Sequence, residues 1–105
     1  MITRKQIVMQ LNPGCEEEYE KRHNNLWPEL ETALKNHGVH NYSIALCRET
    51  NQLFGYAEIE SEEQWATIAE TDACQRWWRY MADIMATNQD NSPKSIELTE
   101  VFYME

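Results

Sequence analysis

The sequence predicts an α+β fold of the ferredoxin-like kind, with element order β-α-β-β-α-β and a four-stranded antiparallel sheet. Segments rich in β-forming residues alternate with segments of helical periodicity, and polar loops at 48–51 and 87–95 separate the later segments. The chain has 105 residues, which is enough for one hydrophobic core and too few for two. We therefore expect a single domain spanning residues 1–105.

The first strand is expected at residues 4–11, which end at the turn sequence NPG. From Cys15 to about Asn36 the apolar residues follow a helical period, and Gly38 is placed to end the helix. Pro28 either kinks this helix or begins a second helical piece. The face expected to turn inward holds Tyr19, His23, Leu26, Leu30, Ala33 and Leu34.

Two β-runs at 39–47 and 52–60 follow, joined by a short polar turn as a plausible hairpin. A short helix is expected to begin at a capping box, with Ser61 as the cap and Gln64 reaching back to it. This helix continues through Ile68.

The second main helix is expected at residues 73–85, with Thr71 or Asp72 as its cap. After a polar loop, the closing strand is expected at 96–103. With this order both helical regions cover one face of the sheet, so the other face is left open.

The open face of the predicted sheet is not polar. In the first strand Ile7, Met9 and Leu11 alternate with Gln6, Val8 and Gln10, and the remaining strands carry apolar residues at both parities. Apolar residues on both faces of so small a sheet indicate that a second subunit covers the open face. We therefore expect a homodimer.

Composition excludes several classes of partner. The formal net charge of −9 disfavours nucleic acid and anionic membranes. No apolar run approaches the ~20 residues that a membrane helix needs, and the N-terminal segment lacks the features of a signal peptide. We therefore expect a cytoplasmic protein, in which Cys15, Cys47 and Cys74 are reduced thiols without a disulfide or zinc site.

His23 is the strongest single candidate for chemistry, because an imidazole with an ordinary pKa of about 6.5 can give and take protons near neutrality. Tyr19 lies four residues earlier, on the same predicted helix face. The alternative is a core histidine whose ring is satisfied by a backbone carbonyl. His37 and His40 are separated by the helix-ending Gly38, so no metal site is expected there.

The adjacent Trp77 and Trp78 are more aromatic surface than one buried stripe needs. At roughly 100° per residue, Trp77 falls near the middle of the inward stripe and Trp78 at its rim. The two rings are either core or interface aromatics, or they form the wall of a sugar site. In the second case Tyr42, from the second strand, could add its hydroxyl to the same site.

Several segments resemble the L-rhamnose mutarotase family. They are EEYEKRHNNLWPELE (17–31), HNYSIAL (40–46), TDACQRWWRYM (71–81), DNSP (90–93) and EVFY (100–103). The resemblance runs almost from end to end without an insertion, and the paired Trp after CQR is among its most specific features. It implies a dimeric α+β barrel, in which two ferredoxin-like protomers pack sheet against sheet.

The resemblance also implies an isomerase that interconverts the α and β anomers of L-rhamnose without a cofactor, in cytosolic rhamnose catabolism. It implies that His23 is the proton donor. It further implies that the sugar is bound by Tyr19, Tyr42, Trp77 and Trp78. Asn25 and Gln89 stand where family members have proline, which puts the local loop shape in doubt.

Anomer exchange needs a base for the O1 proton and an acid for the ring oxygen, and the sequence does not identify the base. Two other readings stay open beside the mutarotase. One is a haem-degrading or quinol monooxygenase of the same barrel fold, with His23 as iron ligand or base. The other is a non-catalytic dimeric module that binds a ligand.

Overall fold

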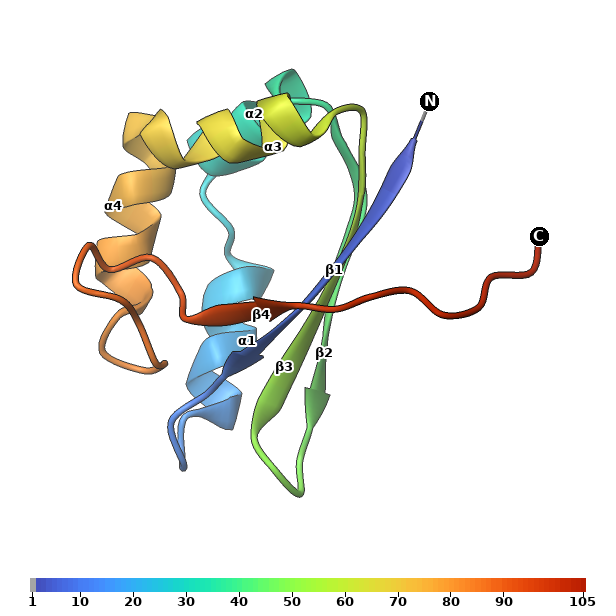
Figure 1. Cartoon of the computed structure of the whole chain (residues 1–105). Helices are drawn as coiled ribbons and strands as arrows, with labels where there is room; N and C mark the ends of the chain where they lie inside the picture. The colour runs from blue at the N-terminus through green and yellow to red at the C-terminus, as the bar shows by residue number, and fades with distance from the viewer. Residues whose placement is uncertain (1) are drawn as a thin grey trace.

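The computed structural model describes residues 2–105. Its elements, in chain order, are β1 (Thr3–Gln10), α1 (Glu16–Asn24), α2 (Pro28–Asn36), β2 (Val39–Cys47), β3 (Gln52–Ile59), α3 (Glu62–Thr67), the 3-10 turn η1 (Ile68–Glu70), α4 (Asp72–Met81) and β4 (Ser95–Glu97) (Figure 1). The strands form one antiparallel sheet in the order β2-β3-β1-β4. The predicted ferredoxin-like α+β fold is confirmed.

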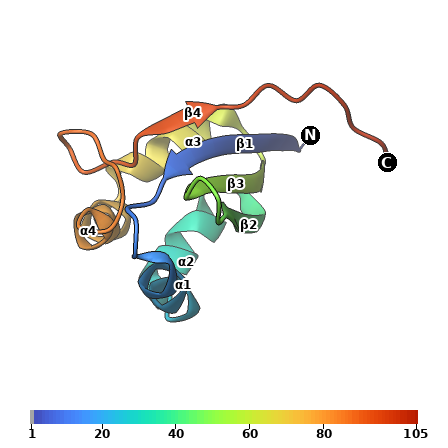
Figure 2. The ribbon, with the colours of Figure 1, turned by 90° about the horizontal axis from the view of Figure 1, so that it is seen from below.

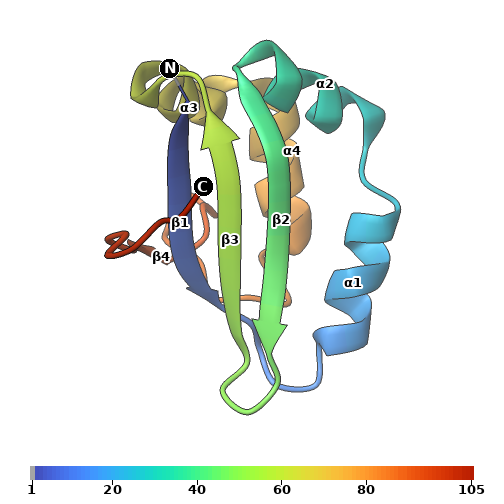
Figure 3. The ribbon, with the colours of Figure 1, turned by 90° about the vertical axis from the view of Figure 1, so that its right-hand side faces the viewer.

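The helices lie on one face of the sheet, and the opposite face is open, as Figures 2 and 3 show from two directions. Along β3 the side chains alternate between these faces: Leu53, Ala57 and Ile59 are buried under the helices, whereas Phe54 on the other face is exposed. This alternation follows from the two-residue period of a strand. The core between the sheet and the helices includes Met9, Leu11, Leu30, Val39, Leu53, Ile59, Ile68, Trp77, Met81, Ile84 and Met85.

The first helical region is two helices, which is the second of the two arrangements expected at Pro28. The chain is extended at Trp27, with ψ of 130°, and Pro28 begins α2. The proline ring disfavours the helical conformation at the residue before it. Proline itself suits the first position of a helix, because a backbone N–H at that position would have no partner within the helix. The break lets α1 and α2 turn independently over the sheet.

The two expected caps are present. The Ser61 hydroxyl accepts a hydrogen bond from the Gln64 backbone N–H at 3.0 Å, and it donates to the Gln64 side-chain oxygen at 3.3 Å. Thr71, rather than Asp72, caps α4, because its hydroxyl accepts from the Cys74 N–H at 3.3 Å. Each cap satisfies a backbone donor that the first turn of a helix leaves free.

The expectation that the second main helix reaches residue 85 is wrong, because α4 ends at Met81. The backbone groups that follow bond to the end of β1 instead: the Ile84 carbonyl accepts from the Asn12 N–H at 2.9 Å, and Met85 forms a bridge with Leu11. Ile84 and Met85 are nevertheless buried, as the helical pattern indicated.

The closing strand is also shorter than the expected 96–103, since only Ser95–Glu97 pairs with β1. The Leu98 N–H makes one further bond, to the Gln6 carbonyl at 2.8 Å, and the chain then leaves the sheet as an extended segment (Figures 1 and 2). Alternating apolar residues favour a strand, but a strand also needs a neighbour with free backbone groups. Residues 98–105 are all exposed.

No helix in residues 2–105 combines the length and the apolar character that crossing a membrane requires. The side chains of Cys15, Cys47 and Cys74 are free thiols, and that of Cys74 is buried.

Candidate active site

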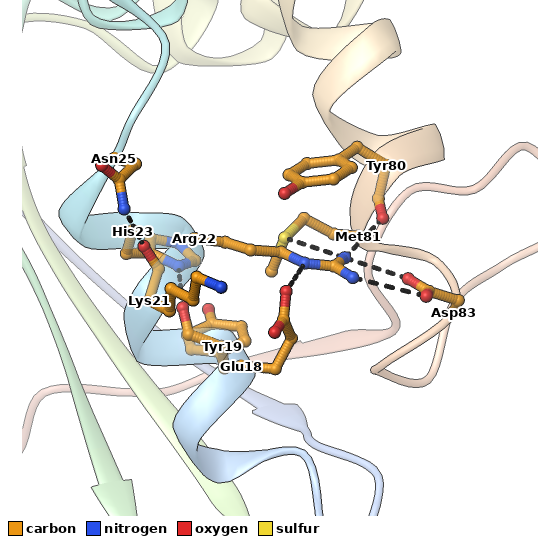
Figure 4. A network of polar contacts seen from close by, with 9 residues as sticks. All are labelled: Glu18, Tyr19, Lys21, Arg22, His23, Asn25, Tyr80, Met81 and Asp83. Atoms are coloured by element: carbon orange, nitrogen blue, oxygen red, sulfur yellow. Dashed lines mark hydrogen bonds and ion pairs between the residues drawn. The ribbon is translucent and has the colours of Figure 1, made fainter.

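Tyr19 and His23 lie one turn apart on α1 and face the sheet side of the helix. The two rings stack with their centroids 4.3 Å apart and their planes 27° from parallel. The Nδ1 atom of His23 lies 3.0 Å from the backbone carbonyl oxygen of Tyr19 (Figure 4). This is the contact expected of a satisfied core histidine, but it occupies only one of the two ring nitrogens.

That contact fixes the tautomer of His23. A carbonyl oxygen can only accept, so Nδ1 carries the proton and Nε2 carries the lone pair. Burial lowers the pKa of His23 below its ordinary value, and the hydrogen bond to Tyr19 opposes this only in part. Every buried polar side-chain atom in residues 2–105 has a hydrogen-bond partner, so Nε2, for which these residues supply none, is not fully buried, and His23 is among the residues that line a cavity.

Trp77 and Trp78 project from α4 into different surroundings. Trp77 is only 7% exposed, belongs to the core, and packs against His23 in a T-shaped arrangement, with ring centroids 5.4 Å apart and planes at 88°. Trp78 is half-buried at the edge of the core. The helix arithmetic that placed Trp77 in the stripe and Trp78 on its rim is confirmed, and Trp77 serves both the core and the cavity wall.

A β-bulge in β2 aims Tyr42 at the helices. The register steps from His40↔Glu58 to Ser43↔Tyr56, so two residues of β2 stand opposite one of β3. Asn41 takes the left-handed conformation this needs, with φ of 48°, and its side-chain amide donates to Glu58 at 2.8 Å. Part of the Tyr42 ring stays exposed, whereas burial of its hydroxyl raises the pKa of Tyr42 to about 12.

The five predicted residues line one cavity between the sheet and the helices. These residues are Tyr19, His23, Tyr42, Trp77 and Trp78. The cavity is open to solvent and has a volume of ≈ 1090 Å³, slightly above the roughly 300–1,000 Å³ usual for small-molecule sites. Aromatic faces, two phenol hydroxyls and one imidazole suit a neutral polyhydroxylated ligand, because C–H groups pack on the rings and hydroxyls bond to the polar tips.

Trp65 and Lys5 are among the residues lining this cavity that sequence reasoning did not assign to the site. The Trp65 ring on α3 lies 6.2 Å from that of Tyr42. Lys5 faces the helices from β1, where its ammonium group lies 2.9 Å from both Glu62 and Glu97. The sequence contains an indication for each residue. Trp65 is the one aromatic residue in its polar helix. Lys5 lies two residues before Ile7 on the same strand, so the two side chains point to the same face of the sheet.

Comparison with known proteins supports a specific family. Residues 4–104 match the family model described as L-rhamnose mutarotase. L-rhamnose mutarotases of Shigella flexneri serotype 5b (strain 8401) and Escherichia coli (strain K12) are 61% and 60% identical to the chain over 103 residues, each match covering 98% of this chain and 99% of the relative.

Solved structures divide into two groups by sequence identity. The crystal structure of L-rhamnose mutarotase from Formosa agariphila has a TM-score of 0.90 at 46% identity, covering 98% of this chain and 99% of that chain. A putative antibiotic biosynthesis monooxygenase from Nitrosomonas europaea has a TM-score of 0.66 at 14% identity, covering 96% and 91%. The second likeness shows a shared fold alone.

Proposed function

The chain belongs to the L-rhamnose mutarotase family, and from this premise we propose how its cavity interconverts the α and β anomers of L-rhamnose. The enzyme is an isomerase that acts on a carbohydrate. One observation carries the proposal: His23 lines the cavity, its Nδ1–H is held by the Tyr19 carbonyl, and its Nε2 has no partner among residues 2–105 and is not fully buried. A ring held in this way is a single group that can first accept a proton and then return it.

Ring opening begins with the neutral imidazole. Nε2 of His23 takes the proton of the O1 hydroxyl, the O1 electron pair forms the C1=O1 double bond, and the bond from C1 to the ring oxygen breaks. The ring oxygen keeps that electron pair and takes the proton from Nε2. Both oxygens are attached to C1, so one nitrogen can serve both, and His23 is then both the base that the sequence left unidentified and the proton donor.

Ring closure is the reverse reaction on the other face of the aldehyde. Rotation about C1–C2 turns the opposite face of C1 toward the ring oxygen. Nε2 takes the proton from this oxygen, the oxygen attacks C1, and the proton passes to O1. The product is the other anomer and His23 is neutral again. The uncatalysed exchange already proceeds in water, so the barrier reduction required of the enzyme is modest.

The remaining cavity residues hold the sugar in this proposal. Tyr19 and Tyr42 have pKa values raised by burial, so their hydroxyls stay protonated and can donate to sugar oxygens. The indole faces of Trp77 and Trp78 pack against sugar C–H groups. A neutral sugar needs no cationic grip, which agrees with the net charge of −9.

The test of the His23 role is saturation-transfer NMR on equilibrated L-rhamnose, in which one anomeric proton is saturated and the transfer to the other is measured. We expect His23→Ala to lower the enzyme's kcat by about 100-fold or more, the usual range for a general acid–base group. His37→Ala is the matched control, because Nδ1 of His37 also bonds to a backbone carbonyl one turn earlier, that of Ala33 at 2.7 Å. Equal exchange in the two variants would remove His23 from the mechanism.

A monooxygenase of the same fold is not favoured. The chain's extensive identity is with L-rhamnose mutarotases, and the likeness to the monooxygenase from Nitrosomonas europaea is limited to the fold.

We also infer that the enzyme is a homodimer that acts in the cytoplasm. The open face of the sheet supports the dimer, because Phe54 and Ile96 are exposed there at 39% and 69%. The exposed C-terminal segment supports it too, since Phe102 is 77% exposed. The three free thiols favour a reducing compartment.

A further inference from the structure

Arg22 fastens α1, which carries His23, to the end of α4, which carries Trp77. Its guanidinium group is held by Glu18 from its own helix and by Asp83 from beyond α4. We propose that Arg22 is a positioning residue for the reaction, because it fixes the His23 imidazole in its place against the Trp77 ring. The inference rests on the proposed role of His23.

Figure 4 shows the contacts that hold Arg22. Its Nε donates to Glu18 at 2.8 Å, and its Nη1 and Nη2 donate to the two carboxylate oxygens of Asp83 at 3.0 and 3.4 Å. Nη1 also donates to the backbone carbonyl of Tyr80 at 2.7 Å. The Arg22 side chain is only 10% exposed, so these bonds are partly shielded from water.

The bond to the Tyr80 carbonyl meets a specific need of α4. The last carbonyls of a helix have no partner within the helix, and the helix dipole places partial negative charge there. A guanidinium group supplied by another helix satisfies one of these carbonyls and is attracted by the dipole. Arg22 therefore binds the C-terminal end of α4 itself, and through Asp83 the turn that follows it.

Arg22 also contacts a pair of stacked aromatic rings against which Trp77 packs. Its guanidinium carbon lies 4.2 Å from the centroid of the Tyr80 ring, and this ring stacks on Trp27 with centroids 5.4 Å apart. Trp77 packs against both rings, at 5.6 Å from Tyr80 and 5.1 Å from Trp27. Trp77 thus contacts His23 as well as the two rings that stack beside Arg22.

Arg22 therefore sets the position of α1, which carries His23, relative to α4, which carries Trp77. Arg22 precedes His23 on α1, and Tyr80 lies one turn after Trp77 on α4. If Arg22 releases the end of α4, the imidazole and the indole wall can shift relative to each other. Such a shift lowers the rate of proton transfer more than it lowers affinity, because proton transfer depends most strongly on the distance between the reacting atoms.

The experiment compares Arg22→Met with Arg76→Met. Arg76 is a matched control: its guanidinium carbon also lies over an aromatic ring, 5.5 Å from the Trp27 centroid, and it also binds two carboxylates, those of Asp72 and Glu29. It differs in that these two carboxylates lie on α4 and α2 rather than on α1. By the NMR exchange assay we expect Arg22→Met to lower kcat about tenfold while KM changes by less than about threefold. Arg76→Met should keep wild-type kcat.

The same substitution in a His23→Ala background separates positioning from folding. If Arg22 acts through His23, adding Arg22→Met to His23→Ala causes no further loss of the residual exchange. A further loss of the same size in this background overturns the proposal, as does wild-type kcat in Arg22→Met. Wild-type exchange in His23→Ala alone would instead overturn the role of His23.

Asp83→Asn tests the proposal if Arg22→Met does not fold. The Asp83 side chain is 68% exposed, and its replacement leaves the Arg22 bonds to Glu18 and Tyr80 in place. We expect a smaller fall in kcat than for Arg22→Met, with KM unchanged. Unchanged kcat in a folded Asp83→Asn protein overturns the proposal.

Discussion

The two faces of the sheet are made by the same strands, yet only one is covered. Leu53 and Phe54 are consecutive residues of β3, and they are 1% and 39% exposed because they point to opposite faces. The covered face packs against the helices and borders the cavity that holds His23. The open face carries Phe54 and Ile96 with no partner in the described chain. The proposed catalysis and the proposed dimer therefore involve different side chains of the sheet, which substitutions can test one at a time.

The largest expected effect is on the covered side. Trp77→Ala should lower the free energy of unfolding by ~3–5 kcal/mol, the usual loss for a buried Trp. Trp77 is 7% exposed and packs against His23, Trp27 and Tyr80. Urea denaturation followed by circular dichroism measures this loss.

Trp78→Ala is the matched control, since Trp78 is the next residue on the same helix but only half-buried. We expect it to raise KM for L-rhamnose more than it lowers stability. Equal losses of stability in the two variants would contradict the distinction between the core position and the rim.

A smaller effect is expected on the open face. Phe54→Asp should weaken the proposed dimer by about 2 kcal/mol, as for a central interface aromatic, because a carboxylate cannot be buried there without a partner. Sedimentation equilibrium measures the dissociation constant. Thr32→Asp, at an exposed position on α2, is the control for the added charge. A monomeric wild-type protein, or an unchanged dissociation constant in Phe54→Asp, would contradict the homodimer.

The covered face was largely predictable from the sequence because its determinants are local. The helix period placed Tyr19, His23 and Trp77 on inward faces. Where the prediction failed, the deciding partner was distant in sequence. Whether the chain after Met81 continues as a helix depends on backbone groups of residues 11–12, which no local pattern reveals.

The same reason explains what was missed at the site. The bulge that directs Tyr42 depends on the pairing of β2 with β3. The hydrogen bonds of the Arg22 guanidinium group depend on where α4 ends, because Asp83 follows that end. Residues 98–105 include the apolar run 101–104 but have no neighbouring strand to pair with among residues 2–105, so the expected strand stops early. Periodicity identified which side chains face inward, and long-range pairing decided how they meet.

The smallest expected effect is the pH dependence that burial gives to the covered side. His23 has a lowered pKa in the folded protein, so below about pH 6.5 the unfolded chain binds a proton at this residue before the folded chain does. Stability is therefore full above about pH 6.5 and falls as the pH decreases toward the lower pKa of the folded state. The proposed mechanism uses the neutral ring, so kcat/KM should fall on the acid side with its midpoint below about pH 6.5. The NMR exchange assay from about pH 4.5 to pH 8, corrected for uncatalysed exchange, measures this midpoint. A fall of kcat/KM on the alkaline side instead would mean that His23 enters the reaction charged, and the order of proton transfers proposed here would have to be reversed.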